Sequence, residues 1–94
     1  MKTTWDRRKN AANRRKHGIT FEEVSALFES DEHLVLFDEG HSEEEERFIS
    51  IGLIQRGVVV VVWTERSELE VRIISARLAT TGERSLFEQY IRGK

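Results

Sequence analysis

Four side chains that can bind or cleave a phosphodiester recur at the spacing of one helix face. They are Lys9, Asn13, Lys16 and His17, at positions i, i+4, i+7 and i+8. Two ammonium groups and an amide supply charge and hydrogen-bond donors for phosphate, and an imidazole titrates near neutral pH. The same pattern is also typical of a histidine that satisfies a helix-end carbonyl beside solvated lysines. The spacing predicts a phosphate-binding face and leaves this structural alternative open.

A second set of charged residues lies on two expected strands joined by a tight turn. Glu65 and Arg66 end one strand, and Arg72 and Arg77 lie on the next. Guanidinium groups form bidentate hydrogen bonds with phosphate oxygens. A cluster of them could stabilise the negative charge that develops at the phosphate during RNA cleavage. Arginine on a strand needs a partner, so ion pairing that completes the fold is the competing interpretation. The carboxylates available for such pairing are Glu65, Glu70 and Glu83.

Capping signals indicate three helices around these residues. Asp6 and Gly18 bracket a helix over 7–17, because aspartate caps helix N-termini and glycine tolerates the positive φ at which helices end. A capping box pairs a Thr with a Glu three residues later. Two such boxes, Thr20 with Glu23 and Thr80 with Glu83, open a helix over 21–29 and a C-terminal helix.

Four apolar segments separated by short polar connections predict strands over 33–37, 47–54, 58–63 and 71–77. Connections this short exclude parallel crossovers, so the strands should pair antiparallel. Five consecutive valines from Val58 favour a central strand that a helix covers on one face. We expect a charged loop over 38–46, a polar turn over 65–70 and strict alternation of side chains along the last strand. The sequence thus predicts an α+β fold, a four-stranded antiparallel sheet with two N-terminal helices and one C-terminal helix packed on it.

Length and composition limit the class of protein. A chain of 94 residues and 11.0 kDa has room for one hydrophobic core, so residues 1–94 should form a single domain. It is 38% hydrophobic and 34% charged, and it lacks both an apolar run long enough for a transmembrane helix and an apolar stretch typical of a secretory signal. Cysteine is absent, which excludes disulfides and thiolate chemistry and suits the cytoplasm.

Charge is segregated along the chain, although the net charge is −2. Residues 1–21 carry seven Lys and Arg against one Asp, whereas residues 22–46 carry eleven Asp and Glu and no Lys or Arg. A local basic face can bind nucleic acid even when the whole protein is acidic. His33, His41 and the run Glu43–Glu46 lack the spacing of metal ligands, so we expect no metal and no cofactor.

Taken together, these residues resemble the BrnT family of bacterial toxins. The resemblance begins with Trp5, Asp6, Lys9, Asn13, Lys16, His17, Gly18, Phe21, Glu22 and Glu23. It continues with Glu46, Arg47, Phe48, Thr64, Glu65, Arg66, the stretch Ile73 to Arg77, Ala79, Thr80, Glu83 and Arg84. The same order over nearly the whole chain is specific, whereas no single motif would be.

The resemblance implies a RelE-like fold and the activity of a ribonuclease toxin from a type II toxin–antitoxin pair. It implies neutralisation by a BrnA-like antitoxin with a ribbon-helix-helix domain, in a complex with two copies of each protein that binds operator DNA through the antitoxin. The family pattern points to Lys9, Asn13, Lys16, His17, Arg66 and Arg77 in this sequence. Leu78 and Gly82 depart from positions that are often basic in the family, which would weaken RNA binding.

The mechanistic hypothesis is metal-independent cleavage, in which the ribose 2′-OH attacks the adjacent phosphate. His17 and Glu65 are the candidates for proton transfer, Arg66 and Arg77 would hold the non-bridging oxygens, and Lys9, Asn13, Lys16 and Arg72 would bind RNA. Two alternatives remain: a non-catalytic binding module, and a corepressor subunit that acts only within a toxin–antitoxin complex. A turnover assay separates both from a nuclease.

Overall fold

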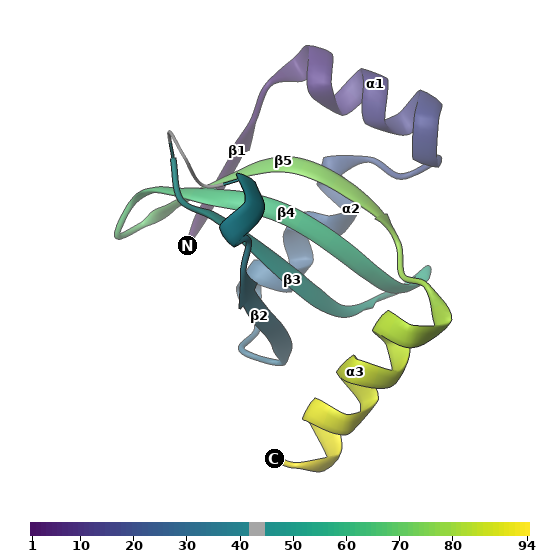
Figure 1. Ribbon diagram of the computed structural model, residues 1–94. Helices are drawn as coiled ribbons and strands as arrows, with labels where there is room; N and C mark the ends of the chain where they lie inside the picture. Colours follow the sequence, from purple (N-terminus) through teal and green to yellow (C-terminus); the bar gives the residue numbers. More distant parts are fainter. Residues whose placement is uncertain (42–44) are drawn as a thin grey trace.

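The computed structural model describes residues 1–41 and 45–94 and shows helices on both faces of one sheet (Figure 1). The helices are α1 (Arg7–His17), α2 (Phe21–Val24) and α3 (Thr81–Arg92), with short 3₁₀ segments at Ser25–Glu29 and Glu39–His41. The strands are β1 (Lys2–Trp5), β2 (His33–Phe37), β3 (Arg47–Ile54), β4 (Gly57–Ser67) and β5 (Glu70–Leu78). The α+β class is confirmed. None of the helices within the described ranges is long and apolar enough to cross a bilayer.

The sheet has five strands in the order β1-β5-β4-β3-β2, so the expectation of four strands was one short. The additional strand is β1, which pairs parallel to β5 from Lys2 opposite Glu70 to Trp5 opposite Ile73. The other neighbouring strands pair antiparallel, as predicted. A four-residue strand bounded by no turn signal is invisible to local patterns, because its partner lies far away in the sequence.

Local capping determines where α1 begins and ends, and both predicted bounds are confirmed. The Asp6 carboxylate accepts hydrogen bonds from the amides of Arg8 at 2.7 Å and Lys9 at 3.2 Å. At the other end, Gly18 adopts φ 72°, and its amide donates to the carbonyl of Arg14 at 2.8 Å. These two caps fix the first and last residues of the basic helix.

The second predicted helix is split. Its capping box at Thr20 and Glu23 is present, but only Phe21–Val24 is α-helical and Ser25–Glu29 continues as a 3₁₀ turn. The hydroxyl of Ser25 donates to the carbonyl of Glu22 at 2.8 Å, a local bond that competes with regular helical pairing. Leu27, in this 3₁₀ turn, is buried in the core.

In the long β4–β5 hairpin, two predictions are wrong: the polar turn over 65–70 and the strict alternation along the last strand. Both strands extend into the segment expected as a polar turn, so that only Glu68 and Leu69 connect them. The strict alternation predicted for β5 is broken by a bulge, because Val62 pairs with Ser75 and Trp63 pairs with Ile73, which leaves Ile74 without a partner on β4. As a result, Ala76 is buried on the same side as Ile73.

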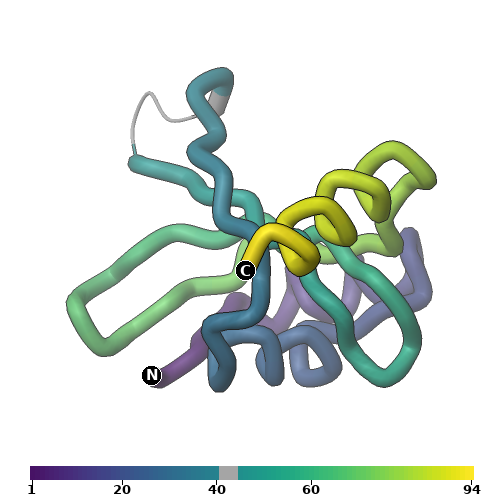
Figure 2. Tube along the Cα trace, turned by 90° about the horizontal axis from the view of Figure 1, so that it is seen from below, coloured from purple at the N-terminus to yellow at the C-terminus, as the bar shows by residue number. Residues whose placement is uncertain are grey.

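Two apolar clusters lie on opposite sides of the sheet. The larger one packs Ile19, Phe21 and Val24 against the buried residues of β4 and β5. The smaller one packs Phe87 of α3 against Ile51 and Val60. Figure 2 shows α3 on one side of the sheet and α2 on the other. The valine-rich strand β4 is therefore central and is covered on both faces, whereas α1 lies along the end of β5 that β1 leaves open.

Candidate functional site

A shallow pocket of about 270 Å³ lies between α1 and β5. Its lining consists of Lys9, Ala12, Asn13, Lys16, His17, Ile74 and Ser75. We call this the α1–β5 groove. It contains all four residues of the helix face predicted from the sequence, and it brings them against the bulge of β5. The two lysines are exposed and His17 is half-buried, so two cations and an imidazole face the solvent side of one groove.

Asn13 has a different environment from its three neighbours, because it is buried. Its side-chain nitrogen donates to the carbonyls of Ile19 at 2.9 Å and Ala76 at 2.8 Å. Its side-chain oxygen accepts from the amide of Ala76 at 3.0 Å. Both amide hydrogens are thus used inside the protein, which leaves no donor for a phosphate. In the structure, Asn13 holds α1 against β5 through these bonds, while its role in RNA binding stays a prediction.

The cations of α1 are available to a ligand. Among the residues that the structure describes, no carboxylate lies within 4.0 Å of a Lys or Arg side chain of this helix. The last turn contains Arg14, Arg15, Lys16 and His17. Positive charge near a helix C-terminus is favourable, since the backbone carbonyls there carry partial negative charge. The described carboxylates therefore leave the Lys and Arg side chains of α1 without ion pairs.

Arg77 lies two residues beyond Ser75 on β5, about 7 Å further along the strand. Its guanidinium forms a bidentate ion pair with Glu83 of α3, with both oxygens at 2.8 Å, and also donates to the carbonyl of Leu78 at 3.3 Å. This pair, together with the capping bonds of Thr80, lowers the pKa of Glu83 to about 2. The ion-pair alternative considered for Arg77 is therefore present, and three of its five donor hydrogens are used.

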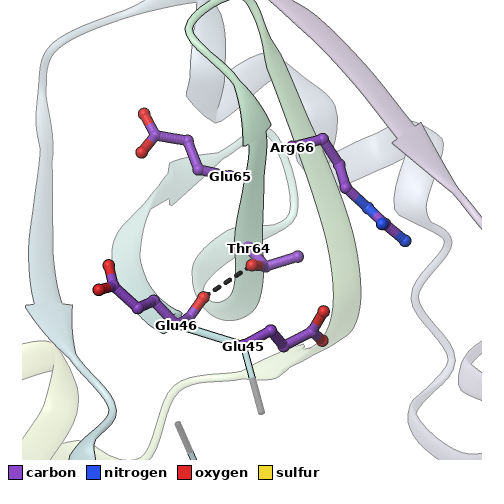
Figure 3. Close-up of a pocket in the computed structure, with 5 residues that line it drawn as sticks. All are labelled: Glu45, Glu46, Thr64, Glu65 and Arg66. Carbon is purple, nitrogen blue, oxygen red and sulfur yellow. Dashed lines mark hydrogen bonds between the residues drawn. The ribbon is translucent and has the colours of Figure 1, made fainter.

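Glu65 and Arg66 lie near the tip of the β4–β5 hairpin and do not reach the α1–β5 groove. They line a different pocket with Glu45, Glu46 and Thr64, where the Thr64 hydroxyl donates to the carbonyl of Glu46 at 2.7 Å (Figure 3). In Figure 3, Glu65 and Arg66 point to opposite sides of β4. The pairing of Glu65 with Val71 places Arg66 about 20 Å from Arg77 along the sheet. The structure does not bring these two arginines together.

Arg72 lies between the two groups, at the N-terminal end of α1. It is opposite Thr4 on one side and Thr64 on the other. The pKa of Asp6 is below its usual value, mainly because the amides of Lys9 and Arg8 donate to it, and the positive charge of Arg72 adds to the effect. Arg72 therefore extends the positive charge of the groove toward the start of α1.

Two residues that the sequence analysis did not single out hold the segment that runs from α1 into α2. Arg56, in the β3–β4 turn, donates to the carbonyl of Gly18 at 2.8 Å and to the carboxylate of Glu23 at 2.7 Å. Asn10 accepts from the amide of Phe21 at 2.8 Å and donates to Glu22 at 2.7 Å. These bonds join segments that no local spacing relates, so no sequence pattern pointed to either residue.

Comparison with known proteins agrees with this architecture. The family model described as "Ribonuclease toxin, BrnT, of type II toxin-antitoxin system" matches residues 5–83. The crystal structure of the Brucella abortus ribonuclease toxin BrnT is similar to this chain, with a TM-score of 0.67 and 25% sequence identity, covering 86% of this chain and 99% of that one. No curated protein matches the chain. The resemblance seen in the sequence is confirmed, and the chain belongs to the BrnT family of ribonuclease toxins.

Proposed function

We propose that this toxin is an endoribonuclease that cleaves RNA in the α1–β5 groove without a metal ion. The observation that carries the proposal is the convergence of Lys9, Lys16 and His17 on one pocket against β5. This lining is cationic, whereas a magnesium site requires carboxylate and carbonyl oxygens. Cations bind the phosphate directly and lower the energy of the additional negative charge in the transition state.

The ribose 2′-OH is the nucleophile in this mechanism. Its proton is removed, its oxygen forms a bond to phosphorus, and the bond from phosphorus to the 5′ oxygen breaks as that oxygen takes up a proton. The products are a 2′,3′-cyclic phosphate and a 5′-OH. His17 is the proton-transfer group, since its imidazole lies in the groove and histidine is the side chain that most often serves as a general acid or base. Lys9 and Lys16 hold phosphate oxygens.

The other predicted site residues lie at different distances from the α1–β5 groove. Arg77, two residues beyond Ser75 on β5, would contact the phosphate with the donors that Glu83 leaves free. In this proposal, Arg72 and Arg66 bind more distant phosphates along the β4–β5 hairpin. Glu65 pairs with Val71, about 13 Å along β5 from Ser75, so it does not share a phosphate with His17 in this proposal.

The test is cleavage of end-labelled RNA in EDTA by the parent and by His17→Ala. We expect the parent to leave fragments with 5′-OH ends and the variant to be slower by about 10²- to 10⁴-fold. Arg92→Ala is the matched control, because Arg92 is a cation on α3 whose side chain is 79% exposed. Equal cleavage by His17→Ala, or a parent that requires a metal, would contradict the proposal. Binding without turnover would favour the non-catalytic alternatives.

We also propose that the partner is a BrnA-like ribbon-helix-helix antitoxin, which forms a complex with two copies of each protein. The antitoxin binds the operator DNA on behalf of the complex. In the cytoplasm, it relieves the growth inhibition that the toxin causes. The toxin has a surface suited to such a partner at β2, which ends the sheet. Val35, Leu36 and Phe37 on this strand are 46%, 41% and 49% exposed. An apolar edge strand is typically covered by a strand from a partner. Cleavage that persists in excess antitoxin would argue against neutralisation.

A further inference from the structure

A second pocket, of about 450 Å³, lies on another side of α1 from the groove described above. Its lining consists of Trp5, Arg7, Asn10, Ala11, Arg14, Thr20 and Glu22. The pocket combines an aromatic ring, two guanidinium groups and a carboxylate. Nothing in the cleavage mechanism uses these side chains, and together they are typical of a site for a nucleobase.

The aromatic ring is held in a fixed position. Trp5 ends β1 opposite Ile73, and its ring packs edge-on against Phe21 at a centroid distance of 6.2 Å and an interplanar angle of 76°. Arg7 and Arg14 are seven residues apart on α1, so they lie two turns apart along one side of the pocket. Both arginines are exposed and are available to stack on a base or bind its phosphate.

The carboxylate is oriented by the protein as well. One oxygen of Glu22 accepts a hydrogen bond from the side-chain nitrogen of Asn10 at 2.7 Å, and the oxygen of Asn10 is itself fixed by the amide of Phe21 at 2.8 Å. The second Glu22 oxygen accepts no hydrogen bond from the residues that the structure describes. A carboxylate held in this way can accept two parallel hydrogen bonds from a planar ligand.

We propose that this pocket binds a guanine base of the RNA. Guanine places two neighbouring donors, N1–H and N2–H, on its Watson–Crick edge, which matches the two oxygens of Glu22. Adenine and cytosine each place an acceptor beside their amino donor, and uracil flanks its one donor with acceptors, so a carboxylate repels part of each of these edges. The base stacks on Trp5 while an arginine binds its phosphate. The inference rests on the proposed function in one respect: the RNA must lie over α1, where both pockets are.

Binding is tested without cleavage by titrating 5′-GMP and following tryptophan fluorescence. The chain has two tryptophans, and Trp63 is only 9% exposed, so quenching reports on Trp5. We expect 5′-GMP to quench the parent and bind about tenfold more tightly than 5′-AMP, which carries the same phosphate. Glu22→Gln should remove this difference, whereas Glu29→Gln, at an exposed glutamate in the same helical region, should keep it. Equal affinity for both nucleotides in the parent, or an unchanged preference in Glu22→Gln, would overturn the inference.

Cleavage provides a second readout that separates this inference from the proposed function. Oligonucleotides with one guanine replaced by hypoxanthine lack the N2 amino group and should be cut more slowly by the parent but not by Glu22→Gln. If RNA is cleaved with no dependence on the guanine amino group, the pocket assignment is wrong while the nuclease stands. If 5′-GMP binds through Glu22 but no RNA is cleaved, the base site stands and the proposed catalysis fails.

Discussion

The side-chain amide of Asn13 pairs with both backbone groups of Ala76, donating to its carbonyl at 2.8 Å and accepting from its amide at 3.0 Å. This is the hydrogen-bond pattern of a strand neighbour, supplied by one side chain of a helix. It satisfies the edge of β5 just beyond the point where β1 ends. The same amide holds the carbonyl of Ile19, so α1, the following turn and β5 are joined at one buried point.

Asn13→Ala should therefore act on stability. It leaves two buried carbonyls and one buried amide without partners, and we expect the free energy of unfolding to fall by about 2–4 kcal/mol. Urea denaturation measures this loss. Gln55→Ala, at an exposed turn position, is the control. Weakened RNA binding by a variant of unchanged stability would instead support the direct RNA contact that the sequence suggested.

The basic groove makes RNA binding dependent on salt. Each phosphate neutralised by Lys9 or Lys16 contributes about 0.7 to the slope of log K against log salt for a single strand. Lys9→Ala and Lys16→Ala should each lower that slope by about this amount, measured by fluorescence anisotropy of a labelled RNA between low and moderate salt. Arg92→Ala should leave the slope at the parental value. Slopes that are equal in all four proteins would place the RNA elsewhere.

The pair of Arg77 and Glu83 should appear in the acid stability of the protein. The folded pKa of Glu83 is about 2, below its ordinary value of 4.5. Stability from this carboxylate is thus present above pH 4.5 and is lost as the pH falls toward 2. In Glu83→Gln, we expect lower stability at neutral pH and a weaker decline in this acid window. Parallel pH profiles for parent and variant, from urea midpoints, would contradict this role.

His33 should give a second pH dependence closer to neutrality. Its Nδ1 lies 3.0 Å from the hydroxyl of Ser50, which also accepts a bond from the indole nitrogen of Trp63 at 2.8 Å. The pKa of His33 is lowered, mainly because burial disfavours the charged form, while Asp31 opposes this shift and Lys94 adds to it. Stability should fall as the pH drops through 6.5 toward the lower folded pKa, because the unfolded chain binds the proton first. His33→Gln should remove this step from the thermal midpoint measured against pH, and a step of equal size in the variant would assign it to another group.

Two glycines should respond to alanine in opposite directions. A Cβ on Gly52 would lie 2.7 Å from a methyl carbon of Leu27 and 2.9 Å from the Cβ of His33, so Gly52→Ala should lower stability by about 1–3 kcal/mol. A Cβ on Gly82 of α3 meets nothing within 4 Å, and Gly82→Ala should raise stability by up to about 1 kcal/mol. Thermal denaturation of both variants checks the contrast. A neutral Gly52→Ala would mean that β3 can move away from the 3₁₀ segment.

Much of this protein was determined by the sequence itself, wherever the interaction spans a few residues. The bounds of α1 follow from Asp6 and Gly18, the two capping boxes act between residues three apart, and the stiff valines of β4 favour a strand in any context. The shared face of Lys9, Lys16 and His17 follows from the helix repeat alone. The family pattern that identifies the toxin is also carried by residues in order along the chain.

Tertiary structure decided the contacts between segments distant in the sequence. The strand β1 exists because its backbone pairs with β5, 68 residues away in the sequence, and its four residues carry no signal of their own. The bulge at Ile74 shifts the strand register and moves Ala76 into the core, and the hairpin pairing places Arg66 near its tip, far from Arg77. Asn13 looked like a phosphate ligand because residue type gives its hydrogen-bonding capacity, but only the folded chain determines which partners use that capacity. Helix caps act through bonds between neighbouring residues, whereas register and side-chain partners depend on how all the segments pack at once.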